Sequence, residues 1–296
     1  MRWLVTGAGG MLGRDLVAVL EAAGEQVDAR DRAGLDVLDP DAVQAAVSGL
    51  AGDDGPGVVV NCAAWTDVDG AEEREAEATR VNGEAVALIA AACAQTGARL
   101  LHPSTDYVFP GDATAPYAED DPTAPLNAYG RSKLAGEQAV LRLHPEGGYV
   151  VRTAWLYGEH GRNFVATMAR LARDKGPDGT IDVVDDQRGQ PTWTRDLAEQ
   201  LLALGRAADA PRGVYHGTSS GETTWHGLAR AVFEETGHDP QRVLPTTSDK
   251  FVRPAPRPAY SVLGHERWAA AGLEPIRDWR EGLAEAMAEA PGLRTA

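Results

Sequence analysis

Residues 7–13 read Gly7-Ala8-Gly9-Gly10-Met11-Leu12-Gly13 and follow directly on an apolar run at 3–6. Apolar residues then recur at three and four positions over 11–23, which predicts a helix. Glycines between a strand and a helix allow a tight turn, close approach of the backbone to a pyrophosphate and close packing of the helix on the strand. A glycine-rich surface turn is the plainer alternative. We predict a dinucleotide-binding turn whose cofactor contacts are Gly7, Gly10, Met11, Leu12 and Gly13.

Strand and helix patterns alternate through the first half of the chain. Apolar runs predict strands at 3–6, 26–30, 58–61, 99–102 and 149–152. Amphipathic runs between them predict helices at 11–23, 40–50, 83–96 and 129–143. Because mostly apolar strands that alternate with helices form parallel sheets covered on both faces, we predict an α/β fold with a doubly wound parallel sheet of the Rossmann type.

The pattern loosens after about Thr153, where loops rich in Trp, Pro and Gly separate helices predicted at 164–173, 195–204, 225–235 and 278–288. We predict that residues 1–153 form an NAD(P)-binding Rossmann domain. Residues 154–296 are expected to form mainly a smaller α/β substrate-binding lobe at the carboxyl edge of the sheet, with some segments returning to the Rossmann core.

Composition narrows the possible functions. The 296 residues contain 28 Lys and Arg against 44 Asp and Glu, a net charge of −16 that repels nucleic acid and anionic membranes. The two cysteines, Cys62 and Cys93, support neither a disulfide framework nor a thiolate metal site and predict a cytoplasmic location. No apolar run reaches the roughly 20 residues of a membrane span. The acidic stretch 52–57 is expected to form a solvated turn.

Tyr129 and Lys133 are four residues apart on a predicted helix, so their side chains share one face. A tyrosine hydroxyl is a poor acid at neutral pH because its ordinary pKa is near 10, whereas a neighbouring ammonium favours the phenolate. We expect Lys133 to lower the pKa of Tyr129 toward the range of a general acid and to bind ribose hydroxyls. Taken alone, a tyrosine and a lysine four residues apart on a helix are more often ordinary surface residues than a catalytic pair.

Hydroxyl groups stand at the end of the fourth predicted strand, in Ser104 and Thr105, where sheets of this kind bind ligands. A loop cap is the alternative interpretation. The glycine turn, the strand-end hydroxyl and the Tyr129–Lys133 helix occur in the order and spacing that a nicotinamide-dependent reductase needs. Together they predict such an enzyme.

Charged residues after the second predicted strand bear on the choice of cofactor. Arg30 and Arg32 are suited to a 2′-phosphate, whereas Asp31 and Asp36 suit ribose hydroxyls or adenine. We predict NADPH, with NADH as the alternative, and take Arg30, Asp36, Ala63 and Ala64 as further cofactor contacts. In so acidic a chain an anionic ligand needs local cations, and Arg253 and Arg257 are our candidates for a diphosphate.

The spacing of Gly7, Gly10 and Gly13 resembles that of the short-chain dehydrogenase/reductase superfamily. Along essentially the whole chain the sequence also resembles the dTDP-4-dehydrorhamnose reductase family. The stretches that carry this second resemblance are 61–64 with Asp67 and 71–72, 104–109, 124–130, 133–137, 152–157, 163–164, 186–192 and 257–263.

This resemblance implies the reduction of the 4-keto group of dTDP-4-dehydro-6-deoxy-L-mannose to dTDP-L-rhamnose. It also implies a catalytic triad of Thr105, Tyr129 and Lys133, with Asp106, Tyr107, Trp155 and Asn163 around the substrate. Metal-bridged dimers of the family use acidic residues. Asp15 is acidic here, but Arg195 stands where a second acidic partner is expected, so we predict no metal and either a monomer or a homodimer.

Four alternative functions stay open at this point. A related reductase, such as a dTDP-dihydrostreptose synthase, differs only in its sugar. A dehydratase of the superfamily would resemble its relatives in an Asp-Glu pair after the catalytic threonine, whereas Asp106 and Tyr107 follow Thr105 here. An epimerase would show no net consumption of cofactor, and a cofactor-binding regulatory homologue would do no chemistry.

Overall fold

The computed structural model describes residues 1–52 and 55–295, so the acidic turn predicted at 52–57 lies partly outside the described residues. Within these residues six parallel strands form the main sheet, in the order β10-β5-β4-β3-β1-β2. They are β1 (Arg2–Thr6), β2 (Gln26–Arg30), β3 (Val58–Asn61), β4 (Arg99–Thr105), β5 (Gly148–Thr153) and β10 (Gly213–His216).

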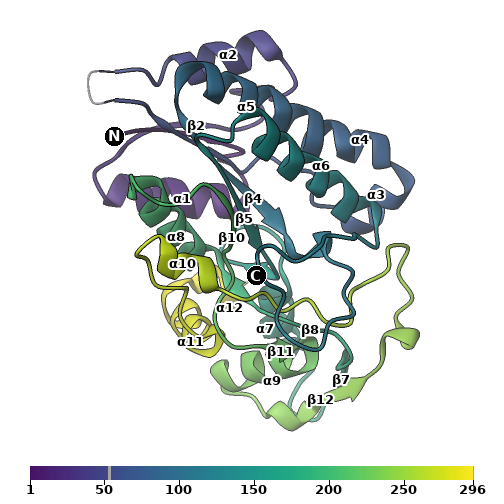
Figure 1. Ribbon diagram of the computed structural model, residues 1–296. Helices are drawn as coiled ribbons and strands as arrows, with labels where there is room; N and C mark the ends of the chain where they lie inside the picture. Colours follow the sequence, from purple (N-terminus) through teal and green to yellow (C-terminus); the bar gives the residue numbers. More distant parts are fainter. Residues whose placement is uncertain (53–54, 296) are drawn as a thin grey trace.

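Helices cover both faces of this sheet (Figure 1). One face carries α1 (Met11–Ala22) and α8 (Thr194–Arg206), and the other carries α2 (Pro40–Ser48), α5 (Ala85–Thr96) and α6 (Ala128–Leu143). Successive side chains of a strand point to opposite faces. Val58 and Val60 accordingly pack with the α1 and α8 side, whereas Val59 packs with the other. The predicted doubly wound parallel sheet is confirmed.

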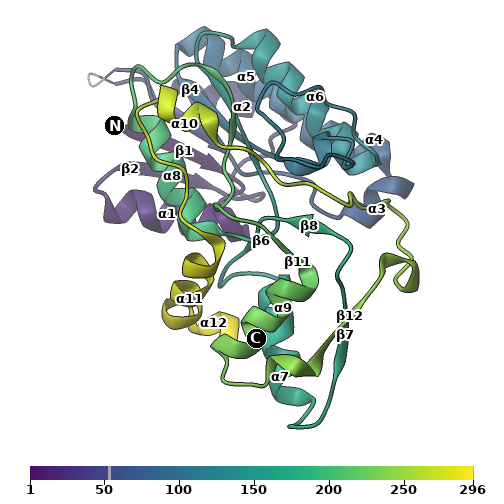
Figure 2. The same cartoon turned by 60° about the horizontal axis from the view of Figure 1, so that its bottom comes forward.

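A smaller lobe lies at the carboxyl edge of the sheet (Figure 2). Its apolar core is built from residues of the lobe helices and their short strands. The helices are α7 (Phe164–Asp174), α9 (Trp225–Glu235), α11 (Trp279–Glu289) and α12 (Pro291–Thr295). The strands pair as β6 (Leu156–Tyr157) with β9 (Thr192–Trp193), β7 (Ile181–Val184) with β12 (Val243–Thr246), and β8 (Arg188–Gly189) with β11 (Thr223–Thr224).

The chain passes between the two parts several times. After the first lobe segment, α8 packs on α1 and β10 extends the sheet beside β5. After the second, α10 (Glu266–Ala270) places Trp268 in the core beneath the sheet, and α11 then returns to the lobe. No helix among the described residues combines the length and the apolar character needed to cross a membrane.

Two predicted boundaries differ from the structure. The helix predicted at 83–96 is preceded by α3 (Val68–Glu73), α4 (Glu75–Thr79) and a π-helical turn, Arg80–Glu84, that runs into α5. Strand β4 continues beyond the predicted end at His102. A proline suggests a break because it lacks an N–H, but the pairing with β5 continues through Pro103 to Thr105 opposite Thr153.

An ion pair buried between α6 and β5 fixes this helix on the sheet. Arg152 Nη2 lies 2.8 Å from Glu137 Oε2, and both side chains are almost fully buried. The guanidinium also donates to the carbonyl of Glu119 and stacks over Phe109. A second ion pair on the same helix, Arg131 with Glu75, is exposed.

We predict that Glu137→Gln lowers the free energy of unfolding by about 3 kcal/mol or more, because Arg152 keeps a buried charge without its counter-ion. The matched control Glu75→Gln should cost less than about 1 kcal/mol, since that pair is solvated. Urea unfolding followed by tryptophan fluorescence measures both. Equal losses in the two variants would contradict the role given to the buried pair.

Candidate active site

A cavity of about 720 Å³ opens at the carboxyl edge of the sheet, where β1 lies between β2 and β3. The strand order reverses at this point, and open α/β sheets bind ligands in the crevice that the reversal creates. The cavity is lined by residues that follow β1, β2 and β3, together with residues of α4 and of the π-helical turn. The predicted cofactor turn forms one of its walls.

Glycine is required in this turn for measurable reasons. Gly7 has φ +65°, and a Cβ there would lie 2.5 Å from the backbone nitrogen of Ala63. A Cβ on Gly13 would lie 2.4 Å from the carbonyl of Gly7, so this glycine allows α1 to pack on β1. Gly10 is the N-cap of α1 and offers no side-chain acceptor, which leaves the first N–H groups of the helix available to an anion.

The other predicted contacts in this region divide into two groups. Asp36, Ala63 and Ala64 line the cavity, as do Gly7 and Gly10. Met11 and Leu12 are not among the lining residues of the described chain. Leu12 is buried in the core beneath the sheet, and Met11 lies against the lobe near Gly158.

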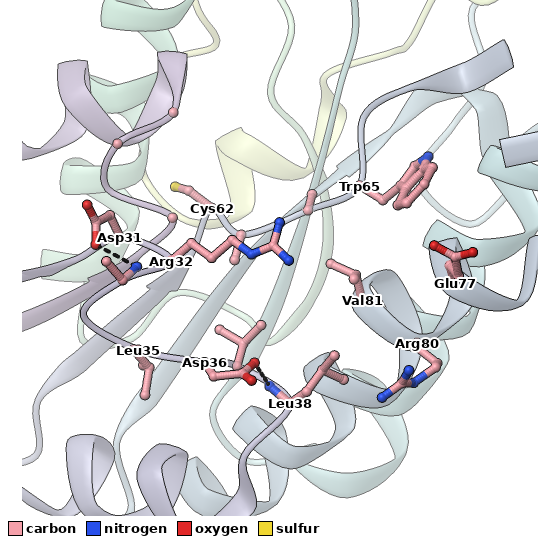
Figure 3. Close-up of a pocket in the computed structure, with 17 residues that line it drawn as sticks. Asp31, Arg32, Leu35, Asp36, Leu38, Cys62, Trp65, Glu77, Arg80 and Val81 are labelled. Atoms are coloured by element: carbon pink, nitrogen blue, oxygen red, sulfur yellow. Dashed lines mark hydrogen bonds between the residues drawn. The ribbon is translucent and has the colours of Figure 1, made fainter. Parts of the chain in front are cut away.

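The structure does not bring Arg30 to the cavity. Its guanidinium is paired with Asp28, two residues back on β2, and side chains two apart on a strand point the same way. Arg32, in the turn after β2, reaches across the cavity instead, and Arg80 with Trp65 forms the opposite wall (Figure 3). Neither Arg32 nor Arg80 belongs to an ion pair in the described part of the chain.

The predicted catalytic residues lie next to this cavity. Thr105 ends β4, and Tyr129 and Lys133 lie on α6, whose first turn is capped by Asn127. A Cβ on Gly130 would lie 2.2 Å from the carbonyl of Tyr107, so the helix begins in close contact with the loop after β4. Lys133 is near Cys62 of the cavity wall, since each alters the pKa of the other.

Tyr129 has the environment of a neutral phenol. Burial, together with the nearby charge of Asp106, raises its pKa to about 12, and a hydrogen bond with Thr105 opposes both effects. The net shift is therefore opposite to the one expected from the neighbouring Lys133, because loss of hydration outweighs any attraction of the phenolate to the ammonium. Burial also lowers the pKa of Lys133 to about 8. The phenol holds its proton at neutral pH, as a general acid must.

Asp106 and Tyr107 lie beside Tyr129. Thr105 Oγ1 donates to Asp106 Oδ1 over 3.0 Å, and burial raises the pKa of this carboxyl to about 6. The ring of Tyr107 meets that of Tyr129 edge to face at 6.0 Å. Burial raises the pKa of the Tyr107 hydroxyl, so this group stays neutral.

Trp155 joins the strand end to the lobe. Among the described residues it is the only non-glycine with a positive φ, 46°. Its indole stacks on that of Trp225 with 3.6 Å between ring centroids, and a Cβ on Gly189 would lie 2.6 Å from it. Strain in a bulky residue next to strand-end polar groups is typical of a functional position.

Three other predicted substrate residues are already engaged. Asn163 caps α7 by accepting from the N–H of Ala166 and donates to the carbonyl of Gly158, so its amide serves the fold. Arg257 Nη2 lies 3.0 Å from Asp69 Oδ1, and Arg253 Nη1 lies 3.9 Å from Asp69 Oδ2. These arginines lie on the segment between β12 and α10, and their contact with Asp69 of α3 joins this segment to the Rossmann part.

Sequence reasoning missed several residues of the site. Asn82, in the π-helical turn, accepts from the N–H of Trp65 and donates to its carbonyl, and it also donates to Ser132 Oγ on α6. It therefore ties the cavity wall to the catalytic helix. Asp69 and Trp225 were missed as well. Trp65 alone carries a local signal of a site residue, because it directly follows the motif at 61–64. No local sequence pattern marks Asn82, Asp69 or Trp225 as site residues.

The residues present fit a dinucleotide. The α1 N-terminus has no side-chain cap, and two arginines of the cavity have no counter-ion among the described residues. Two buried hydroxyls at the strand ends, Ser104 Oγ and Thr153 Oγ1, also have no hydrogen-bond partner within the described chain. Native proteins rarely leave such groups unpaired unless a ligand completes them.

Comparisons with known proteins agree with this geometry. The family described as "RmlD substrate binding domain" matches residues 1–291. The chain is 56% identical over 287 residues to a dTDP-4-dehydrorhamnose reductase of Streptomyces griseus, covering 96% of this chain and 92% of that protein. It is also 56% identical over 288 residues to a probable dTDP-4,6-dihydroxy-2-methyloxan-3-one 4-ketoreductase of Streptomyces antibioticus, covering 97% and 94%.

Among solved structures, the dTDP-4-dehydrorhamnose reductase of Bacillus anthracis in complex with NADP is similar, with a TM-score of 0.90 and 36% identity. The match covers 97% of this chain and 99% of that one. The family match over residues 1–291 and the relatives at 56% identity indicate the same family. The chain belongs to the RmlD substrate-binding-domain family.

Proposed function

We propose that this protein uses NADPH to reduce the 4-keto group of a dTDP-linked 6-deoxy sugar, converting dTDP-4-dehydro-6-deoxy-L-mannose to dTDP-L-rhamnose. The observation that carries the proposal is the position of the Tyr129 phenol, beside Thr105 and packed with Trp65 of a crevice that the glycine turn lines. The Streptomyces and Bacillus relatives, both dTDP-4-dehydrorhamnose reductases, support the same chemistry.

Each catalytic side chain has one task in the reduction. The bound nicotinamide supplies the hydride. As the carbonyl oxygen gains negative charge, Tyr129 donates its proton to it, and Thr105 supports the same oxygen by turning its O–H from Asp106 toward it. Lys133 is one helical turn further along α6 and supplies the positive charge that offsets the phenolate left behind.

The proposed substrate contacts lie on both sides of the tyrosine. Asp106 and Tyr107 are at the Rossmann side, and Trp155 is at the lobe side. Arg257 is our main candidate for the diphosphate, since its side chain is only 19% exposed and its guanidinium is held by Asp69. We infer from this arrangement that residues 154–296 contribute the substrate lobe to a Rossmann domain formed mainly by residues 1–153.

NADPH is proposed over NADH because two arginines of the cavity have no counter-ion in the described chain. Arg32 and Arg80 face each other across the adenosine end, where a 2′-phosphate brings two negative charges (Figure 3). Asp36 is left to the ribose hydroxyls. A cytoplasmic location is part of the same proposal, since NADPH and the free thiols Cys62 and Cys93 suit a reducing compartment.

A related 4-keto sugar reductase is the second candidate, and the Streptomyces antibioticus relative favours it. Incubation with dTDP-4-dehydro-6-deoxy-L-mannose and NADPH, with the product identified by NMR, separates the two. Formation of dTDP-L-rhamnose supports the first candidate. A dehydratase is disfavoured because Tyr107, neutral and half-buried, stands where relatives of that kind would need a titrating glutamate.

We predict that Tyr129→Phe lowers kcat by about 10² to 10⁴-fold and leaves NADPH binding nearly unchanged, because it removes the proton donor and little packing. The matched control Tyr107→Phe should raise KM for the sugar roughly threefold to tenfold with little effect on kcat. Steady-state kinetics and calorimetry measure these effects. If Tyr107→Phe abolished turnover and Tyr129→Phe did not, the two roles would have to be exchanged.

Gly10→Ala should weaken NADPH binding at least about tenfold without unfolding the protein, because the methyl group enters the space needed by the pyrophosphate. Gly49→Ala is the control: this glycine ends α2 with a right-handed conformation and lies outside the cavity. Calorimetric titration with NADPH gives both constants. Equal affinities would exclude this turn as the phosphate cradle.

Arg32→Ala should raise KM for NADPH about tenfold or more, since a charge-assisted hydrogen bond to phosphate contributes about 1.5–3 kcal/mol. KM for NADH should change by less than about twofold, because NADH lacks that phosphate. Arg30→Ala, two residues earlier at the end of β2 and paired with Asp28, is expected to alter neither. The assignment fails if Arg30, rather than Arg32, controls the preference.

A further inference from the structure

Four polar side chains form a buried chain beneath the carboxyl ends of three neighbouring strands. Thr6 ends β1, Asn61 ends β3, His102 lies in β4, and Lys133 reaches them from α6. None is more than 3% exposed. Thr6 Oγ1 is 2.6 Å from Asn61 Oδ1, Asn61 Nδ2 is 3.3 Å from His102 Nδ1, and His102 Nε2 is 3.5 Å from Lys133 Nζ.

The hydrogens of this chain point in one direction. Thr6 donates to the amide oxygen of Asn61, so the amide nitrogen, which can only donate, faces Nδ1 of His102. Burial and the charge of Lys133 hold the pKa of His102 well below its ordinary value, so the ring is neutral. A neutral ring that accepts at Nδ1 carries its hydrogen on Nε2. That N–H faces Lys133.

An N–H aimed at a lysine distinguishes between its two forms. It donates to the lone pair of a neutral amine and repels an ammonium. The other groups around Nζ are the carbonyl of Pro103, which accepts over 2.8 Å, the thiol of Cys62, and Glu137 on the same helix, already paired with Arg152. Burial raises the pKa of Cys62 to about 12, so the thiol is neutral.

We propose that His102 is a positioning residue for the reduction: directed by Thr6 and Asn61, it favours the neutral amine of Lys133 and so eases transfer of a proton from Lys133 to Tyr129. This inference rests on the proposed function. After Tyr129 has given its proton to the sugar oxygen, its phenolate takes a proton from the ammonium, forming an O–H bond and breaking an N–H bond. The neutral amine then regains a proton from water. Burial already lowers the pKa of Lys133 to about 8. The hydrogen bonds from Thr6 through Asn61 to His102 favour the neutral amine and so lower this pKa as well.

The test measures the pKa of Lys133 directly in the cofactor-free protein. The chain has three lysines, Lys133, Lys175 and Lys250, so ¹³Cε-lysine NMR gives three signals, and Lys133→Met assigns the first. Thr6→Val frees the Asn61 amide to turn, which lets His102 accept from the ammonium. The pKa of Lys133 should then rise by about one unit. Thr246→Val, another buried strand threonine, is the control and should cause no shift.

The same variant has a kinetic signature. In Thr6→Val the alkaline limb of the kcat profile should move to higher pH by the same amount as the lysine signal. An unchanged or lowered lysine pKa in Thr6→Val overturns the proposal, because a merely structural threonine has no reason to shift this titration upward.

A second measurement is made on the unmodified protein. ¹⁵N-histidine NMR of the unmodified protein, with the His102 signal assigned by its loss in His102→Gln, reports which ring nitrogen carries hydrogen. We expect hydrogen on Nε2; hydrogen on Nδ1 overturns the proposal. Both NMR measurements are independent of turnover, whereas failure of the proposed function would appear in the Tyr129→Phe kinetics.

Discussion

The ammonium of Lys133 is a charge that the fold keeps away from water, and much of the surrounding structure follows from that. A buried cation needs acceptors in place of its hydration shell. The carbonyl of Pro103 supplies one, and the carboxylate of Glu137 supplies a compensating field while Arg152 fixes its position. Strand β4, strand β5 and helix α6 therefore meet around one side chain. Tyr129, one turn earlier on the same helix, takes its place relative to Thr105 from this arrangement.

Close contact between backbones is the second requirement of the site. Glycines 7, 13 and 130 stand where a Cβ would approach another backbone atom within 2.5 Å, and they lie where β1 meets β3, where α1 meets β1 and where α6 meets the loop after β4.

The acidic chain repels anions at long range, so phosphate groups depend on cations and N–H groups at short range. Arg257 shows the cost of that solution, because it needs a carboxylate, Asp69, to hold it in place without a ligand.

The sequence predicted what depends on local pattern. Strand alternation gave the parallel sheet, and the glycine turn gave the position of the crevice. It could not predict which way side chains face after a strand ends, and for that reason Arg30 was preferred to Arg32. It also could not predict solvation: the spacing of Tyr129 and Lys133 indicates attraction, but burial, a tertiary property, decides the pKa of the phenol. Asn82 was missed because its role depends on contacts with Trp65 and Ser132, distant in sequence.

The path of the chain between the two parts has a consequence for engineering. Because α8 and β10 lie between two lobe segments, and α10 precedes a third, the lobe is interleaved with the Rossmann part rather than appended to it. A fragment ending at Thr153 would leave β5 as an open sheet edge and expose the apolar side of α1. Chimaeras that exchange sugar preference between relatives therefore need several junctions. Placing them on either side of α8–β10 and of α10 would preserve the parental sheet.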